Sequence, residues 1–250
     1  MAAVRPDVDT IAAPPFPRGL QWVNVAPLRM DQQRGRPVLI EFFDVCRVAS
    51  LQTLPYVRAW HDRYAKQGLR VISVHAPGYP PSHDEDAVRA AIERLGIEHP
   101  VCLDTEFELW RAFDNEGWPA RYLFDGAGIL VEFHYGPGAY AETELAIQEQ
   151  LGVTDDLLAP VYPQDDPEAL IVVPTPEQEG AYSGPYEAGG AWAVLSGTGT
   201  VTVNGSLVEV DGIGAYPLVE HGAHTAAVLE LEIGPGVTCH ATVFTPGLAA

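Results

Sequence analysis

Over the first 150 residues, short apolar runs typical of strands alternate with segments whose apolar residues have helical spacing. This alternation constrains the fold more than any other feature. Residues 37–43, PVLIEFF, form a short apolar run typical of a strand buried on both faces. Residues 50–68 place apolar side chains three and four positions apart, which predicts a helix that ends at Gly68. Similar patterns predict strands at 69–77 and 99–104, helices at 84–96, 106–114 and 141–152, and a hairpin over 120–136. This order indicates an α/β sandwich with a mixed sheet.

A different pattern begins near residue 153. Residues 153–179 are rich in Pro and Asp, which is typical of a linker. Short alternating runs then predict strands at 192–195, 200–203, 207–210, 215–219, 226–233 and 238–244, with Asn204-Gly205 as a hairpin turn. We therefore expect a flexible N-terminal arm (1–18), an α/β domain (19–152), a Pro/Asp-rich linker (153–179) and an all-β sandwich (180–250).

The charges are distributed unevenly along this acidic protein. All 14 Lys and Arg residues lie between Arg5 and Arg121, with 16 Asp and Glu in residues 1–121 and 18 in residues 122–250. The first segment is thus near neutral (14 − 16 = −2), and the second carries −18. Nucleic-acid binding needs Lys and Arg against phosphate, so we expect no nucleic-acid partner.

The cysteines and the hydropathy limit the redox setting and the location. Cys46, Cys102 and Cys239 lie far apart, and such a sparse, odd set argues against a disulfide scaffold. No apolar run approaches the ~18–20 residues of a membrane span, and residues 1–20 contain no apolar signal-peptide core. We expect a cytoplasmic protein without a membrane span, or an extracytoplasmic one if a leader was removed.

Several segments together resemble thioredoxin-like redoxins. They are GLQWVNVAPLRM (19–30), the strand EFF (41–43), TLPYVRAWHDRY (53–64), VISVHAP (71–77), LGIEHPV (95–101) and EGWPARYLFDGAG (116–128). Their order and distances resemble those of the TlpA- and ResA-like proteins, and in particular the C-terminal region of the DipZ-type cytochrome c biogenesis proteins. The resemblance implies a thioredoxin-like fold for residues 19–152. It also implies that residues 180–250 are similar to carbohydrate-binding jelly rolls.

The resemblance places two cysteines, spaced Cys-x-x-Cys, in the turn after the first buried strand. In an ungapped alignment Arg47 takes the first cysteine position and Ser50 the second, while Cys46 lies one residue early. A gap at this point would rotate the following helix by about 100°. The ungapped alignment is therefore preferred, and it predicts a degenerate active site.

Dithiol exchange needs a low-pKa thiolate that attacks and a second thiol that resolves the mixed disulfide. Ser50 cannot form a disulfide, and Arg47 places a cation where a helix N-terminus favours an anion. We therefore expect ordinary disulfide exchange to be lost. Cys46 is then either a buried small apolar residue or a single reactive thiol beside Arg47.

Other residues take their expected roles from the resemblance. Trp118-Pro119 matches the family's cis-proline position, where a loop lies against the active-site turn. Glu41 matches a buried acid that relatives use in proton transfer, and with Phe43 and Trp118 it is a candidate binding residue. The histidines at 221, 224 and 240 lack the His-x-His and Glu spacing of cupins, so we expect no metal site.

Two functions follow. The first is a redoxin-family oxidoreductase of the antioxidant class, by resemblance, with single-thiol chemistry at Cys46. The alternative is a non-enzymatic binding or scaffold protein that uses the thioredoxin groove, framed by Arg47, Ser50 and Pro119, and a carbohydrate-binding-like β module. The expected partner is a protein or small-molecule thiol or disulfide, with carbohydrate as a further possibility. No cofactor is expected.

Overall fold

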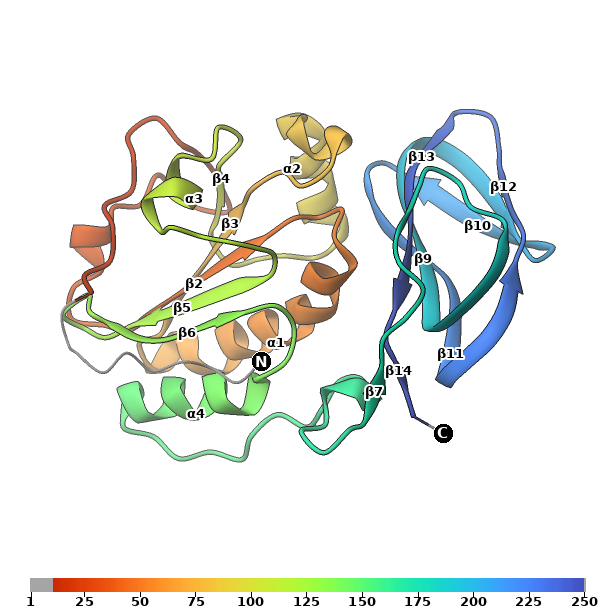
Figure 1. Cartoon of the computed structure of the whole chain (residues 1–250). Coiled ribbons are helices and arrows are strands. Elements are labelled where there is room, and N and C mark those ends of the chain that lie inside the picture. The colour runs from red at the N-terminus through yellow and green to blue at the C-terminus, as the bar shows by residue number, and fades with distance from the viewer. Residues whose placement is uncertain (1–10, 250) are drawn as a thin grey trace. The chain divides into compact units, whose positions relative to one another are not determined.

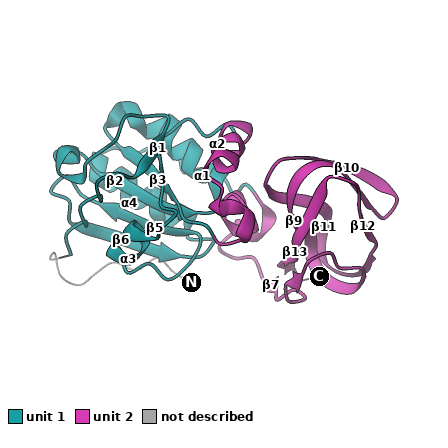
Figure 2. Ribbon diagram, turned by 90° about the horizontal axis from the view of Figure 1, so that it is seen from above, with its two compact units in different colours: residues 1–44, 52–77, 96–161 teal, residues 45–51, 78–95, 162–250 magenta. Residues whose placement is uncertain are grey.

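The computed structural model describes residues 11–249 and separates them into two compact units (Figures 1 and 2). Of the described residues, one unit contains 11–44, 52–77 and 96–161. The other contains 45–51, 78–95 and 162–249. Residues 1–10 of the expected arm lie outside the described residues, and the domain boundaries expected at 153 and 180 stay predictions.

A six-stranded mixed sheet forms the first unit, in the order β1-β4-β3-β2-β5-β6 (Figure 1). Its strands are β1 (Gln21–Val23), β2 (Val38–Phe43), β3 (Arg70–His75), β4 (Val101–Leu103), β5 (Ala120–Phe124) and β6 (Leu130–Tyr135). Strands β2, β3 and β4 are parallel, and the remaining pairs are antiparallel. Each strand predicted for this part is present, and β1 is an additional edge strand.

Four α-helices connect or follow these strands. They are α1 (Val48–Tyr64), α2 (Glu85–Arg94), α3 (Glu108–Ala112) and α4 (Tyr140–Leu151). The side chain of Asp84 caps α2 by accepting the N–H groups of Asp86 and Ala87. Gly152 ends α4 in the left-handed conformation, with a φ of 67°. Short 3₁₀ helices occupy Met30–Gln33, Ala65–Gln67, Pro80–His83 and Pro163–Asp165.

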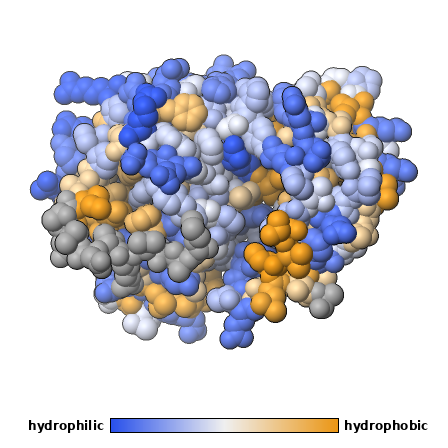
Figure 3. Space-filling view, viewed as in Figure 1, coloured by the Kyte–Doolittle hydropathy of each residue, from blue (hydrophilic) through white to orange (hydrophobic). Residues whose placement is uncertain are grey.

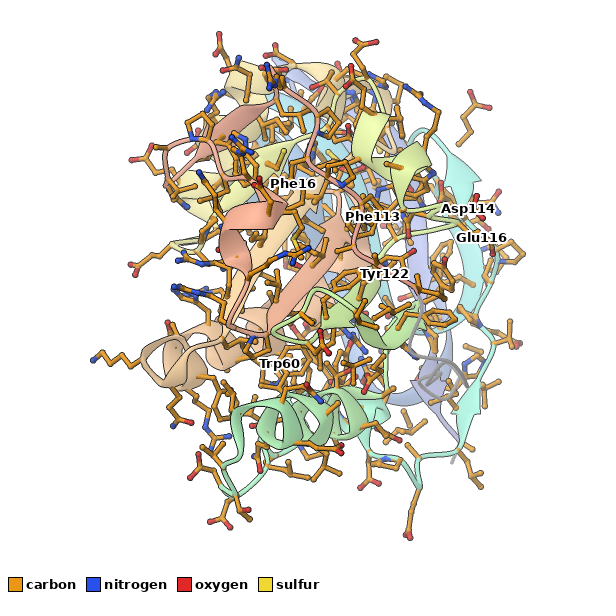
Figure 4. All side chains as sticks on the ribbon, turned by 90° about the vertical axis from the view of Figure 1, so that its left-hand side faces the viewer. Phe16, Trp60, Phe113, Asp114, Glu116 and Tyr122 are labelled. Carbon is orange, nitrogen blue, oxygen red and sulfur yellow. The ribbon has the colours of Figure 1, made fainter. Side chains whose placement is uncertain are left out.

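The sheet separates two apolar cores because successive side chains of a strand point to opposite faces. On one face, Leu39 and its neighbours pack against α1 and α4 through Trp60, Tyr64 and Ile147. On the other, a second cluster joins the sheet to α3 and includes Phe16 from the segment before β1. Figure 4 labels Trp60 near α1 and α4, and Phe16 and Phe113 on the other side. Glu41 has the same strand parity as Leu39, so it faces α1 and α4.

The β-rich part of the second unit consists mainly of antiparallel strands, consistent with a β-sandwich. Its strands are β7 (Ile171–Val172), β8 (Gln178–Glu179), β9 (Gly184–Val203), β10 (Ser206–Asp211), β11 (Gly214–Leu229), β12 (Leu231–Ile233), β13 (Val237–Thr245) and β14 (Gly247–Leu248). Strand β9 pairs with β10, β11, β12 and β13, while β7 and β14 form a separate two-stranded sheet.

Two expectations for this part were wrong. The strands predicted at 192–195 and 200–203 are one continuous strand, β9, and those at 215–219 and 226–233 are mainly one strand, β11. Gly197 lets β9 bend without ending, because its φ is 94° and a Cβ there would lie 2.0 Å from the Gly236 carbonyl oxygen. Strand β11 continues through two register shifts.

The surface in Figure 3 is mainly hydrophilic, with separate apolar patches. Among the described residues, the most exposed large apolar side chains are Leu170, Leu207 and Val173, and Val173 is 86% exposed. Within residues 11–249, the helices are too short or too polar to span a bilayer.

Candidate functional site

The turn between β2 and α1 contains the positions that the resemblance assigns to a dithiol. Strand β2 ends at Phe43, and α1 begins at Val48. The carbonyl oxygen of Arg47 accepts the Leu51 N–H at 3.0 Å, so Arg47 is the N-cap of the helix. Ser50 lies in the first turn. Positions 47 and 50 are therefore one turn apart at a helix N-terminus, where the dipole and free N–H groups favour an anion.

The side chains of this turn differ in their access to solvent. Cys46 and Ser50 are both 0% exposed, whereas Arg47 is partly exposed. All three cysteines are free thiols. The burial of Cys46 favours its interpretation as a small apolar residue, because reactive cysteines are at least partly accessible.

Arg47 is held beside an aromatic ring. Its guanidinium lies 5.1 Å from the ring centroid of Tyr79, close enough for a cation–π interaction. The Tyr79 hydroxyl in turn donates a hydrogen bond of 2.9 Å to Glu177. The helix N-terminus therefore carries a positive charge at a defined place, opposite in sign to the thiolate of a dithiol enzyme.

The loop that contains Trp118 and Pro119 is fixed within the first unit. The peptide bond between these residues is cis. The indole N–H of Trp118 donates to the Ala76 carbonyl oxygen at 2.9 Å, and its ring packs 4.2 Å from that of Trp110. Pro119 is buried, and its carbonyl oxygen accepts the Gly136 N–H at 2.8 Å. A contribution of Trp118 and Pro119 to binding stays a prediction.

Two polar residues at the ends of β2 and β3 were not singled out as a pair from the sequence. Nε2 of His75 lies 3.4 Å from a carboxylate oxygen of Asp44, and both side chains are almost completely buried. Phe43 packs edge-on against His75, with ring centroids 5.4 Å apart. Because Phe43 is opposite His75 in the parallel register, Asp44 follows at the point where the two strands end.

Glu41 is the centre of a second buried group. It is 0% exposed and accepts a hydrogen bond of 2.7 Å from the Ser73 hydroxyl. Nε2 of His99 lies 2.7 Å from the same hydroxyl oxygen. Because Ser73 has a single O–H and donates it to Glu41, the His99 ring must donate its Nε2–H to Ser73. Glu41, Ser73 and His99 thus form one buried chain of hydrogen bonds.

Burial strongly perturbs both ends of this chain. Loss of solvation raises the pKa of Glu41 to about 7, although the Ser73 hydrogen bond and the charge of Arg121 oppose the rise. Loss of solvation also lowers the pKa of His99 to about 3, and the nearby His61 and Arg58 lower it further. Both groups are therefore neutral in the folded protein over a wide range of pH.

Arg121 is opposite Glu41 on the neighbouring strand and is also buried. Its guanidinium donates to the Gly138 carbonyl oxygen and lies 4.9 Å from the ring centroid of Tyr140. Burial lowers the pKa of the Arg121 guanidinium, while Tyr140, Glu41 and Glu132 oppose the fall. The interior beneath α1 and α4 thus contains a carboxyl group and a guanidinium on neighbouring strands.

The sequence analysis did not predict Ser73 and His99 as members of the buried group around Glu41. The signal that could have identified Ser73 is the parallel pairing of β2 and β3, which places it opposite Glu41. His99 carries a weaker signal, since it lies just before β4, whose neighbour β3 carries Ser73.

The β-rich part offers less chemistry. The hydroxyl of Tyr186 lies 2.9 Å from Nε2 of His221, and its ring stacks on Phe244 inside the apolar core. Within residues 11–249, no group of three or more His, Cys, Asp or Glu side chains is arranged to hold a metal ion. Carbohydrate binding by this part stays a prediction.

The burial of the cysteines predicts an order of reactivity. In the native protein iodoacetamide should modify Cys239 first, because Cys239 is partly exposed whereas Cys46 and Cys102 are 0% exposed. Burial also raises the pKa of the Cys102 and Cys239 thiols. We expect Cys46 to react at least about tenfold more slowly than Cys239. Peptide mass spectrometry would measure this, with labelling in denaturant as the control, and faster reaction of Cys46 would contradict it.

Comparisons with known proteins agree with this architecture. The chain is 32% identical over 133 residues to protein DipZ of Mycobacterium tuberculosis, which covers 52% of this chain and 19% of DipZ. It is 28% identical over 134 residues to the thiol-disulfide oxidoreductase YkuV of Bacillus subtilis, which covers 54% of this chain and 90% of YkuV. The chain thus spans about a fifth of DipZ and most of YkuV.

The solved structures support the same fold. A DsbE-type thiol:disulfide interchange protein of Chlorobium tepidum superposes with a TM-score of 0.51 at 19% identity, covering 56% of this chain and 96% of that protein. No protein-family profile matches the chain. The mixed sheet, the helices around it and the relatives agree: about half of the chain has the thioredoxin-like fold and is similar to thioredoxin-like redoxins.

Proposed function

We propose that this chain is a thioredoxin-fold binding protein in which ordinary dithiol exchange is lost. The observation that carries the proposal is the chemistry at the start of α1. The two positions one helical turn apart are Arg47 and Ser50, and the adjacent Cys46 has no exposed surface. A helix N-terminus of this kind supplies a cation and a hydroxyl in place of two thiols.

The requirements of disulfide exchange support this proposal. A thiolate must attack the substrate disulfide, and a second thiol must displace the substrate from the mixed disulfide. Cys46, Cys102 and Cys239 have no Cys-x-x-Cys spacing, and each is a free thiol. A single buried sulfur can complete neither step at a useful rate.

The relatives suggest what the protein binds. YkuV is named as a thiol-disulfide oxidoreductase, so its partners carry thiols or disulfides. We extend to this chain the class of partner, a protein with a thiol or disulfide, and not the catalytic turnover. This extension is an analogy from the shared fold, because the sheet and the helix that follows the turn are present while the two thiols are not.

Insulin reduction by dithiothreitol tests the proposal. The wild-type chain should precipitate insulin at the uncatalysed rate, while a thioredoxin with an intact dithiol accelerates the reaction in the same buffer. Acceleration that persists in Cys46→Ser would overturn the proposal outright. Acceleration that disappears in Cys46→Ser would replace it with single-thiol chemistry at Cys46.

A further inference from the structure

A cavity of about 390 Å³ lies between α3, the β5–β6 hairpin and the segment before β1. Its volume is in the range of small-molecule sites, and the site proposed here does not depend on the loss of dithiol exchange. Its lining combines aliphatic side chains with five aromatic ones and has Asp114 as the charged member; the aromatic residues are Phe113, Tyr122, Phe124, Phe133 and Tyr135. Figure 4 shows Phe113 and Tyr122 close together, with Asp114 and Glu116 farther out.

The rings that line the cavity have different orientations. Tyr122 and Phe133 are nearly parallel, at 18°, with centroids 6.3 Å apart. Tyr135 stands at 89° to Tyr122 and at 71° to Phe133. Aromatic faces carry partial negative charge. Rings at right angles that line one cavity can present this charge to a ligand from more than one direction, which is the arrangement of aromatic cages that hold cations.

The hydroxyl groups of the two tyrosines are used within the protein. The Tyr122 hydroxyl donates to Asn115 at 2.8 Å and lies 2.9 Å from the Tyr135 hydroxyl. The Tyr135 hydroxyl also lies 3.4 Å from the Asp114 carbonyl oxygen. Because both hydroxyl groups are engaged within the protein, the cavity suits a ligand that needs few hydrogen bonds.

The described part of the cavity carries charge of one sign. Among the described residues that line it, Asp114 is charged and exposed and none is Lys or Arg. Burial and the hydrogen bond with Tyr135 raise the pKa of the Tyr122 hydroxyl, with smaller contributions from the charges of Asp114 and Glu116. The carboxylate of Asp114, a residue that lines the cavity, favours a cation there and disfavours a carboxylate or phosphate.

We propose that this cavity binds an organic ammonium ion, with its alkylated cationic head against the rings of Tyr122, Phe133 and Tyr135 and an apolar body within the pocket. Alkyl groups on the nitrogen remove the need for hydrogen-bond acceptors, and the ring faces and Asp114 offset the charge. A neutral aromatic ligand would keep only the apolar contacts, and an anionic ligand would be repelled.

Benzyltrimethylammonium is a suitable probe, followed by NMR titration of the full chain. We expect saturable shifts centred on Phe113, Phe133 and Tyr135, with a dissociation constant on the order of 0.1–1 mM. Benzyl alcohol, a neutral ring, should bind at least about fivefold more weakly, and phenylacetate should not bind. Equal binding of benzyl alcohol, shifts elsewhere, or no saturation would overturn the proposal.

Two variants separate the charge from the rings. Asp114→Asn should weaken the probe about fivefold, while the matched control Glu106→Gln, on an exposed carboxylate that does not line the cavity, should leave it unchanged. Phe133→Leu should weaken the probe about tenfold by removing a ring face. Because Asp114 is exposed, its variant tests the proposal even if Phe133→Leu destabilises the fold. Equal effects of Asp114→Asn and Glu106→Gln would contradict a cation site.

Discussion

Replacing Arg47 and Ser50 together with cysteine is expected to give this protein a working dithiol. Position 47 is the N-cap of α1 and is partly exposed, whereas position 50 is buried in the first turn. One thiol would thus meet the substrate, and the other would lie one helical turn away to displace it. The double change also removes the cation of Arg47 and leaves the helix N-terminus free to stabilise a thiolate.

The expected effect is large because the reaction changes from uncatalysed to catalysed. We expect the double variant to reduce insulin at least about tenfold faster than the wild-type chain, and to cycle between a dithiol and a disulfide. The double change is made together with Cys46→Ser, so that the new thiols cannot pair with Cys46. Counting the thiols before and after mild reduction would show the new disulfide.

The single variants serve as matched controls. Arg47→Cys alone should form mixed disulfides that accumulate, because no thiol resolves them. Ser50→Cys alone should show no gain, because a buried thiol cannot attack. A double variant that folds and forms the disulfide but remains inactive would show that more than the two sulfurs has been lost from this site.

The regular elements were predictable where the sequence pattern is local. Strand β2 is buried at all six positions and reads as an apolar run, and α2 carries its own cap at Asp84. Strands β1 and β7 have three and two residues, show no periodicity and were not predicted, whereas the three-residue β4 was predicted because a helix is expected on each side of it. Their existence depends on distant partners, as in the pairing of Trp22 with Cys102 and of Ile171 with Leu248.

The candidate site was predictable only in part for a similar reason. The turn could be aligned because Phe42-Phe43 and Thr53-Leu54-Pro55 flank it at fixed distances. The partners of Glu41 are set by sheet register, which places Ser73 opposite it and brings His99 alongside. The burial of Cys46 likewise depends on three-dimensional packing that no local pattern encodes.

The buried chain of Glu41, Ser73 and His99 is expected to limit stability at both ends of the pH scale. Between pH 4.5 and about 7 the folded protein keeps a proton on Glu41 that the unfolded chain has lost, so stability falls as pH rises. Between about pH 3 and 6.5 the unfolded chain holds a proton on His99 that the folded protein lacks, so stability rises with pH. The two contributions oppose each other between pH 4.5 and 6.5.

Each pKa unit corresponds to about 1.4 kcal/mol. The rise in the pKa of Glu41 from 4.5 to about 7 therefore costs about 3 kcal/mol of unfolding free energy above pH 7. The fall in the pKa of His99 costs about 5 kcal/mol below pH 3. These contributions are comparable with the total stability of many domains.

Urea unfolding of wild type and Glu41→Gln at pH 5 and pH 8 isolates the contribution of Glu41 to the loss of stability at high pH. Glutamine keeps an oxygen that accepts the Ser73 hydrogen bond and carries no charge, so the variant should gain about 2–3 kcal/mol relative to wild type on going from pH 5 to pH 8. The exposed control Glu106→Gln should show no such change. An equal difference at both pH values would contradict the assignment to Glu41.

Ser73→Ala extends the test to the hydrogen bond itself. The Ser73 hydroxyl lowers the pKa of Glu41 by stabilising its charged form, so its removal should raise that pKa further. The decline in stability should then continue to higher pH than in wild type. Below pH 6 the pH dependence of stability that His99 contributes should be much the same in the variant as in wild type. Desolvation is the main cause of the low pKa of His99, and the substitution does not change it.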